Sequence, residues 1–116
     1  MKEPSTIYKI CTRQEWDDAV SVGEFLGSAV DLKDGFIHFS TREQTRETAA
    51  KHFVGQTDLV LVSFETQQFG DQLKWEVSRG GARFPHLYAT LPTASASAVV
   101  ELPLDGDGNH RFAKDF

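Results

Sequence analysis

The order of apolar and polar residues predicts helices early in the chain and strands alone later. An apolar run at 6–11 predicts a first strand. It leads into residues 12–15, a capping-box pattern in which a Thr oxygen and a Glu carboxylate bind the first free amides of a helix. We expect that helix to continue to Val22 and to end at Gly23. Its predicted apolar face consists of Trp16, Ala19 and Val20.

A second predicted helix follows a short strand. Turn residues after the first helix predict a loop, and residues 36–40 then alternate as in a strand. Residues 40–43 form another capping-box pattern, so we expect a helix from Arg42 to Phe53, closed by Gly55. Its predicted buried face consists of Thr45, Ala49 and Phe53.

The remaining chain predicts strands only. Apolar or alternating segments, each bounded by turn residues, lie at 59–65, 73–78, 86–91 and 98–104. The Asp-Gly pairs at 105–108 predict a tight hairpin that returns through 110–113. Two early helices followed by strands indicate an α+β fold with a mixed or antiparallel sheet.

Three of the predicted strands each have a polar face, because side chains alternate in direction along a strand. The polar or titratable residues on these faces are His38 and Ser40, then Glu76, then His86 and Tyr88. If the three faces converge, they form a concave site with two imidazoles, a carboxylate and a phenol. The pattern does not say which strands are neighbours, so convergence is a hypothesis.

Simpler structural roles are equally consistent with this pattern. His38 is also typical of a half-buried histidine bonded to a backbone carbonyl, and Glu76 of a partner for Arg79 or Arg83. Tyr88 is as consistent with a ring that covers the core, with its hydroxyl in water, as with a ring that binds a ligand. No compact ligand spacing links the histidines to Glu76, so we expect no metal site.

Composition narrows the classes of partner. The 116 residues predict a single domain, 1–116, and their 40% hydrophobic content is that of a globular protein. A net charge of −5 with no basic run disfavours long nucleic acids but not a single nucleotide. Cys11 is the one cysteine, and its apolar surroundings predict a buried, unreactive thiol. No apolar segment is long enough for a signal peptide or a membrane span, so we expect a cytoplasmic protein with no membrane partner.

The chain resembles a bacterial family known as "domain of unknown function 952". The resemblance is carried by four stretches, namely 7–10 with Trp16 behind it, 34–41, 73–76 and 84–88. The family looks like a divergent member of the ADP-ribosyltransferase-like group. This implies a split mixed β-sheet with two N-terminal helices and NAD held in the cleft.

Within that group, the stretch 36–40 is similar to the His-bearing strand of RNA 2′-phosphotransferases. Lys9 takes the position of the first motif residue, commonly a histidine, and His86 and Tyr88 fall where the third motif, often a glutamate, would lie. A lysine at the first position suits a pyrophosphate better than the cation that develops when NAD is cleaved, which favours nucleotide binding over transfer.

The resemblance implies roles for eight residues. The expected catalytic residues are His38, Glu76 and His86, with Glu76 stabilising positive charge on the ribose. The expected residues for binding NAD or an ADP-ribose nucleotide are Tyr8, Lys9, Ser40, Arg79 and Tyr88. Two other hypotheses stay open, a non-catalytic module that senses a nucleotide or other small molecule, and an unrelated role such as protein interaction.

Overall fold

The computed structural model describes residues 4–113 and 116, and of Arg79 it describes the backbone but not the side chain. The phosphate-binding role that we expected of the Arg79 side chain therefore lies outside the described residues. Within those residues the chain forms three sheets, three α-helices and three short 3-10 helices.

All strand pairs of the described chain are antiparallel. The first sheet, in the order β1-β4-β8, contains β1 (Thr6–Thr12), β4 (Leu59–Glu65) and β8 (Ala96–Leu102). The second contains β2 (Glu24–Phe25) and β7 (Leu91–Pro92). The third, in the order β3-β6-β5, contains β3 (Ile37–His38), β6 (Arg83–Leu87) and β5 (Leu73–Val77). The α+β class is confirmed, whereas the mixed sheet is wrong for these strands.

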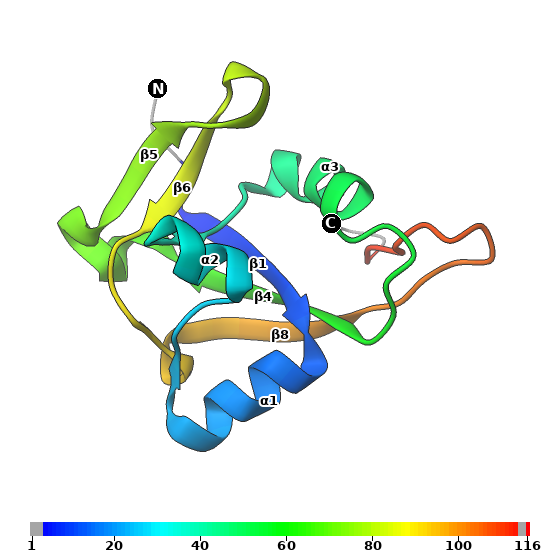
Figure 1. Cartoon of the computed structure of the whole chain (residues 1–116), viewed down its shortest axis with the longest axis horizontal. Helices are drawn as coiled ribbons and strands as arrows, with labels where there is room; N and C mark the ends of the chain where they lie inside the picture. Colours follow the sequence, from blue (N-terminus) through cyan, green and yellow to red (C-terminus); the bar gives the residue numbers. More distant parts are fainter. Residues whose placement is uncertain (1–3, 114–115) are drawn as a thin grey trace.

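Helices flank the sheets on several sides, as Figure 1 shows. The α-helices are α1 (Arg13–Val22), α2 (Ala29–Asp34) and α3 (Arg42–His52). The 3-10 helices are η1 (Thr66–Gln72), η2 (Arg79–Gly81) and η3 (Thr93–Ser95). None of the helices in the described part of the chain has the length and apolar character needed to cross a membrane.

The first helix follows its sequence pattern closely. Thr12 is the N-cap of α1, and its hydroxyl oxygen accepts from the Glu15 amide at 3.0 Å while the Glu15 carboxylate accepts from the Thr12 amide at 2.9 Å. Gly23 ends the helix in the left-handed conformation, with φ of 98°. The expected apolar face is confirmed for Trp16 and Ala19 and wrong for Val20, which is 53% exposed.

Two helix details differ from expectation. α2 replaces part of the predicted loop, so the chain has three helices before β4 rather than two. The N-cap of α3 is Thr41, paired with Gln44, one position after the predicted capping box. Thr45 and Ala49 are buried as expected, but Phe53 is only partly buried.

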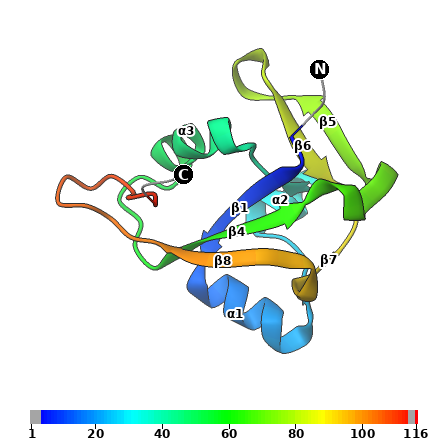
Figure 2. The same ribbon diagram turned by 180° about the vertical axis from the view of Figure 1, so that it is seen from behind.

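Strand β4 lies at the centre of the hydrophobic core. Val60, Val62 and Phe64 belong to the larger cluster, which also contains Trp16 of α1. Alternate residues of the strand belong to a second cluster with Ala49 of α3. Both faces of β4 are therefore buried. Strand β8, beside it, forms an outer edge of this sheet (Figure 2).

The third sheet places the candidate site. His86, on the central strand β6, pairs with His38 of β3 on one side and with Lys74 of β5 on the other. A bridge between Tyr8 and Ser40 joins β1 to the chain after β3, with their amides donating to each other's carbonyls at 2.8 and 2.9 Å. The predicted strand 86–91 is in fact divided, because β6 ends at Leu87 and the chain resumes extended pairing at β7.

Candidate functional site

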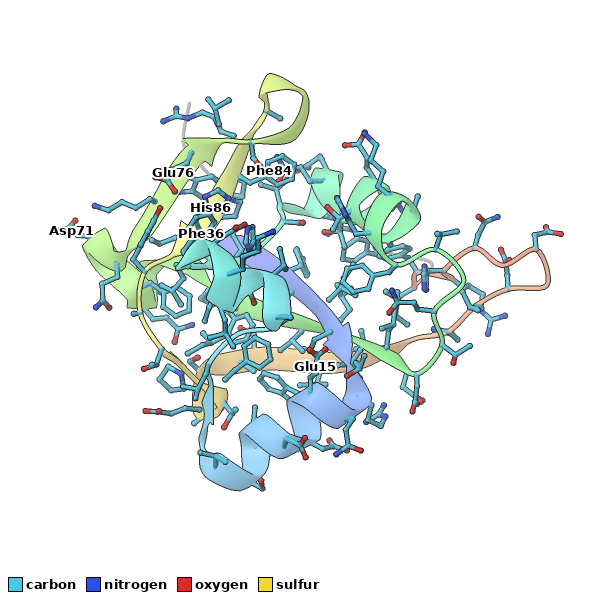
Figure 3. All side chains as sticks on the ribbon, viewed as in Figure 1. Glu15, Phe36, Asp71, Glu76, Phe84 and His86 are labelled. Carbon is cyan, nitrogen blue, oxygen red and sulfur yellow. The ribbon has the colours of Figure 1, made fainter. Side chains whose placement is uncertain are left out.

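The three polar faces converge, as hypothesised from the pattern. The rings of His38 and His86 lie 5.3 Å apart between centroids on neighbouring strands. Oε1 of Glu76, on β5, lies 2.8 Å from Nδ1 of His86 and accepts the Tyr88 hydroxyl at 2.7 Å. Figure 3 shows Glu76, His86 and Phe36 together at one end of the molecule. Sequence reasoning therefore identified a real cluster of side chains.

His86 is the most enclosed member of this cluster. Its side chain is 5% exposed, and its Nε2 atom has no hydrogen-bond partner. Burial lowers the pKa of His86 below its usual value of 6.5, although the hydrogen bond to Glu76 opposes that shift. A neutral ring that donates from Nδ1 to a carboxylate leaves an unshared electron pair on Nε2.

Glu76 interacts with His86 and Tyr88 rather than with open space. Hydrogen bonds from these two residues lower the pKa of Glu76, so it is a carboxylate at neutral pH. The hydrogen bond between Tyr88 and Glu76 raises the pKa of Tyr88, which keeps its proton. The alternative partner Arg83 is not needed to explain the position of Glu76, and the side chain of Arg79 lies outside the described residues.

Phe36 covers the histidine pair and was missed as a site residue. Its ring stacks on His86 at 4.1 Å with an interplanar angle of 26°, and it lies 4.5 Å from the His38 ring. It also lies 5.2 Å from the ring of Tyr88. The sequence offered one hint, because Phe36 directly precedes the histidine strand and shares the strand face of His38.

Lys9 has a different role from the one expected. Its ammonium group donates to both carboxylate oxygens of Asp31, at 2.8 and 3.1 Å, and to the carbonyl of His38 at 2.9 Å. These bonds use all three of its donors inside the protein. These contacts do not support the expectation that Lys9 binds phosphate; in this structure Lys9 holds α2 against β1 and β3.

His38 lies between two carboxylates of α2. Nδ1 is 2.7 Å from Oδ1 of Asp31, and Nε2 is 2.9 Å from Oδ2 of Asp34. Both contacts are hydrogen bonds when the ring carries two protons. Neither nitrogen of His38 is then available to act as a base, and the simpler role with a backbone carbonyl is not the one observed.

Asp31 organises this part of the site from a buried position. Burial alone would raise its pKa, but hydrogen bonds from His38 and the charge of Lys9 hold the pKa well below its usual range. It also accepts from the Ser28 amide at 2.8 Å, as a helix-capping carboxylate. That Ser-x-x-Asp spacing was the signal in the sequence from which α2 and Asp31 could have been found.

A cavity of about 640 Å³ adjoins the histidine pair. Of the expected site residues, its wall includes Tyr8, Lys9, His38, Ser40 and His86. Its wall does not include Glu76 or Tyr88, so the expected contacts of these two residues with a ligand ring or ribose are not supported by their position. The volume is within the range of about 300–1,000 Å³ that is typical of small-molecule sites.

The polar atoms of the wall come from several elements. Ser40 shares a hydrogen bond of 3.0 Å with Thr48 of α3, and Ser78 contributes an exposed position after β5. Among residues 4–113 and 116, no group of three or more histidine, cysteine or acidic side chains is arranged to hold a metal ion. The hydroxyl groups of Ser40 and Ser78 and the ring of Tyr8 in the same wall suit an organic ligand held by hydrogen bonds and aromatic contacts.

Comparison with known proteins identifies the family. Residues 10–101 match the model of "Protein of unknown function (DUF952)". The chain belongs to this family. Among curated proteins, no match to the chain was found.

Solved structures of a second protein have the same fold. The crystal structure of protein CC0527 from Caulobacter crescentus is 56% identical, with a TM-score of 0.88 over 91% of this chain and 93% of that one. The solution NMR structure of CC0527 is 52% identical, with a TM-score of 0.88 over 97% of each chain. The family expectation is confirmed, and these names state no activity, so the ADP-ribosyltransferase-like architecture stays a prediction.

Proposed function

We propose that the cavity binds a small molecule with a ring-and-hydroxyl part, of the class that includes nucleosides and the nicotinamide riboside half of NAD. The observation that carries the proposal is the 640 Å³ cavity on which His38, Ser40 and His86 converge. Tyr8 and Phe84 add aromatic surface to the same wall, which suits a planar ring.

The charges of the cavity wall suit the nucleoside part of a dinucleotide better than its phosphates. Lys9 is the one Lys or Arg among the described wall residues, and its donors are used by Asp31 and His38. A pyrophosphate placed deep in the cavity would meet no unpaired cation of this type. The residues therefore fit the nucleoside part of NAD or ADP-ribose, with the phosphates directed toward solvent.

Transfer of ADP-ribose, which the resemblance implies, has weaker support. Cleavage of NAD builds positive charge on the ribose, which a carboxylate beside it would stabilise. Glu76 was the expected carboxylate, but its Oε1 atom is bound by His86 and Tyr88 and it does not line the cavity. The proposal therefore concerns binding of a nucleoside-type ligand, which corresponds to the small-molecule module.

Thermal denaturation with a panel of ligands tests this proposal. Adenosine, nicotinamide riboside, ADP-ribose and NAD are each compared with inorganic pyrophosphate. We expect the nucleoside-containing ligands to raise the Tm and pyrophosphate alone to leave it unchanged. A ligand at 100 times its Kd stabilises the fold by about 2.7 kcal/mol, which gives a measurable shift.

A pair of variants locates the binding site. Ser78 is exposed on the cavity wall, and S78W would place an indole ring there without replacing a core residue. Ser97 is exposed on the outer strand β8, away from that wall, so S97W is the matched control. We expect S78W to lose the ligand-induced rise in Tm and S97W to keep it. If no nucleoside-containing ligand raises the Tm of the natural chain, the proposal is wrong.

A further inference from the structure

Helix α2 forms part of the cavity wall but has almost no buried apolar surface. Val30 and Asp34 of this helix line the cavity. Of its six residues, all within the described chain, Asp31 alone is buried, and Val30 and Leu32 are 53% and 66% exposed. Segments with few buried apolar contacts open locally at a low cost in free energy. The position of this part of the wall therefore depends on polar contacts.

The His38 ring makes the polar contact that reaches the last turn of α2. Nδ1 of His38 lies 2.7 Å from Oδ1 of Asp31, and Nε2 lies 2.9 Å from Oδ2 of Asp34, the last residue of the helix. An ionised carboxylate only accepts, so each contact is a hydrogen bond only if that ring nitrogen carries a proton. The two contacts together therefore require the doubly protonated, positively charged ring.

The charges around His38 balance when its ring is charged. Among the described residues, the titratable and charged groups that face it are Lys9 of β1, Asp31 and Asp34 of α2, and His86 of β6. Burial lowers the pKa of His86, so that ring is mostly neutral at neutral pH. The cations Lys9 and His38 then face two carboxylates. Removing the second proton from His38 leaves one negative charge in excess.

Loss of that proton breaks the contact with Asp34 rather than the contact with Asp31. The Asp31 side chain is 1% exposed, so the one proton of a neutral ring stays on Nδ1, where it satisfies a buried acceptor. The Asp34 side chain is 39% exposed and can be solvated by water instead. A negative charge at the C-terminal end of a helix is unfavourable, because the helix dipole is negative there. Without its cationic partner, Asp34 therefore destabilises the last turn of α2.

We propose that the charged His38 ring holds the last turn of α2 in place as a wall of the cavity, and that loss of the second ring proton releases this part of the wall. The ring is 29% exposed, so it exchanges protons with the solvent and responds to the pH of the medium. The effect on binding rests on the proposed function. A wall that is already ordered costs no ordering entropy when a ligand binds, so the charged form of His38 favours binding.

Amide hydrogen exchange, measured by NMR on the full chain, tests this contact without any ligand. The amides of Leu32 and Gly35 each donate to a carbonyl four residues earlier, at 3.0 and 2.9 Å. Their protection is corrected for the intrinsic effect of pH on exchange. We expect it to fall about fivefold between about pH 5 and 8, as for an exposed ion pair at the upper end of its usual range. The midpoint should coincide with the titration of the His38 ring, followed by its own proton signals.

Two variants separate this contact from other effects of pH. An asparagine amide can accept from a ring N–H or donate to a ring nitrogen, so D34N can pair with both charge states of His38. We expect D34N to make the protection of the α2 amides independent of pH. Asp18 is an exposed carboxylate of α1 that accepts from Gln14 at 2.8 Å and does not line the cavity. D18N is therefore the matched control and should keep the pH dependence of the natural chain.

Three results of the exchange measurement would overturn the proposal. They are protection of the α2 amides that stays constant over this pH range in the natural chain, a pH dependence that D34N keeps, and a midpoint that follows a histidine other than His38.

The effect on binding has a measurement of its own. The rise in Tm caused by adenosine is compared at the acid and alkaline ends of the same pH range. We expect a larger rise at the acid end in the natural chain and equal rises in D34N. Equal rises in the natural chain would overturn the effect on binding. If none of the nucleoside-containing ligands raises the Tm at either pH, the proposed function is wrong, and the exchange data alone decide the role of His38.

Discussion

The ammonium group of Lys9 lies 2.8 Å from Oδ2 of Asp31, and the two side chains are 6% and 1% exposed. This pair joins β1 to α2 beneath the histidine cluster. Breaking a buried pair by removing one partner costs about 3–5 kcal/mol, because the other charge is left buried and unpaired. We expect K9M to lower the free energy of unfolding by about this amount, measured by urea denaturation.

An exposed pair provides the control for that measurement. Lys51 and Glu47 lie 3.7 Å apart on the surface of α3, with both side chains more than half exposed. Exposed pairs contribute up to about 1 kcal/mol, so K51M should have a small effect. Equal losses in K9M and K51M would show that the Lys9–Asp31 pair does not hold the site together.

The stability of the fold should depend on the ionisation of Asp31. Its pKa in the folded protein is held well below the usual value of about 3.9, so Asp31 stabilises the fold above that pH. This contribution is lost as the pH falls through 3.9 toward the folded-state pKa. The difference in unfolding free energy between the natural chain and D31N should therefore shrink below about pH 4. A difference that stays constant down to the acid limit of the measurement would contradict this.

Local sequence patterns predicted several helices and strands of the fold correctly. The capping box at Thr12 and Glu15, and the apolar run that became β4, act within a few residues and survive in the structure. Exposed Val20 shows the limit of such reasoning, because helical spacing does not say how far the buried face extends. α2 was missed because its pattern is short and its buried residue is an aspartate rather than an apolar side chain.

The site was predictable in its members but not in their roles. Strand alternation placed His38, Glu76 and His86 on the polar faces, and the β3-β6-β5 order brought them together. His38 is hydrogen-bonded to Asp31, and Phe36 stacks on His86, and alternation along a strand predicts neither contact. Lys9 illustrates this, since no local pattern could show that its partner comes from a helix 22 positions along the chain.

Cys11 should react only when the protein unfolds. Its side chain is 1% exposed in the main core, and burial raises its pKa to about 12, although the nearby charge of Lys9 opposes this shift. The reactive thiolate is thus scarce at neutral pH. We expect Ellman's reagent to label Cys11 at the rate of unfolding in native buffer and at once in urea. Fast labelling of the folded protein would contradict the buried position that both sequence and structure assign.

The protonation of the His86 ring tests the hydrogen bond between its Nδ1 atom and Glu76 most directly. Long-range proton–nitrogen correlation NMR on the histidine-labelled protein reports each ring nitrogen separately. We measure one pH unit above the usual histidine pKa of about 6.5. The structure leads us to expect a protonated Nδ1 and an unprotonated Nε2 for His86, because Glu76 accepts from Nδ1 at 2.8 Å. A proton on Nε2, or on both nitrogens, would contradict the account.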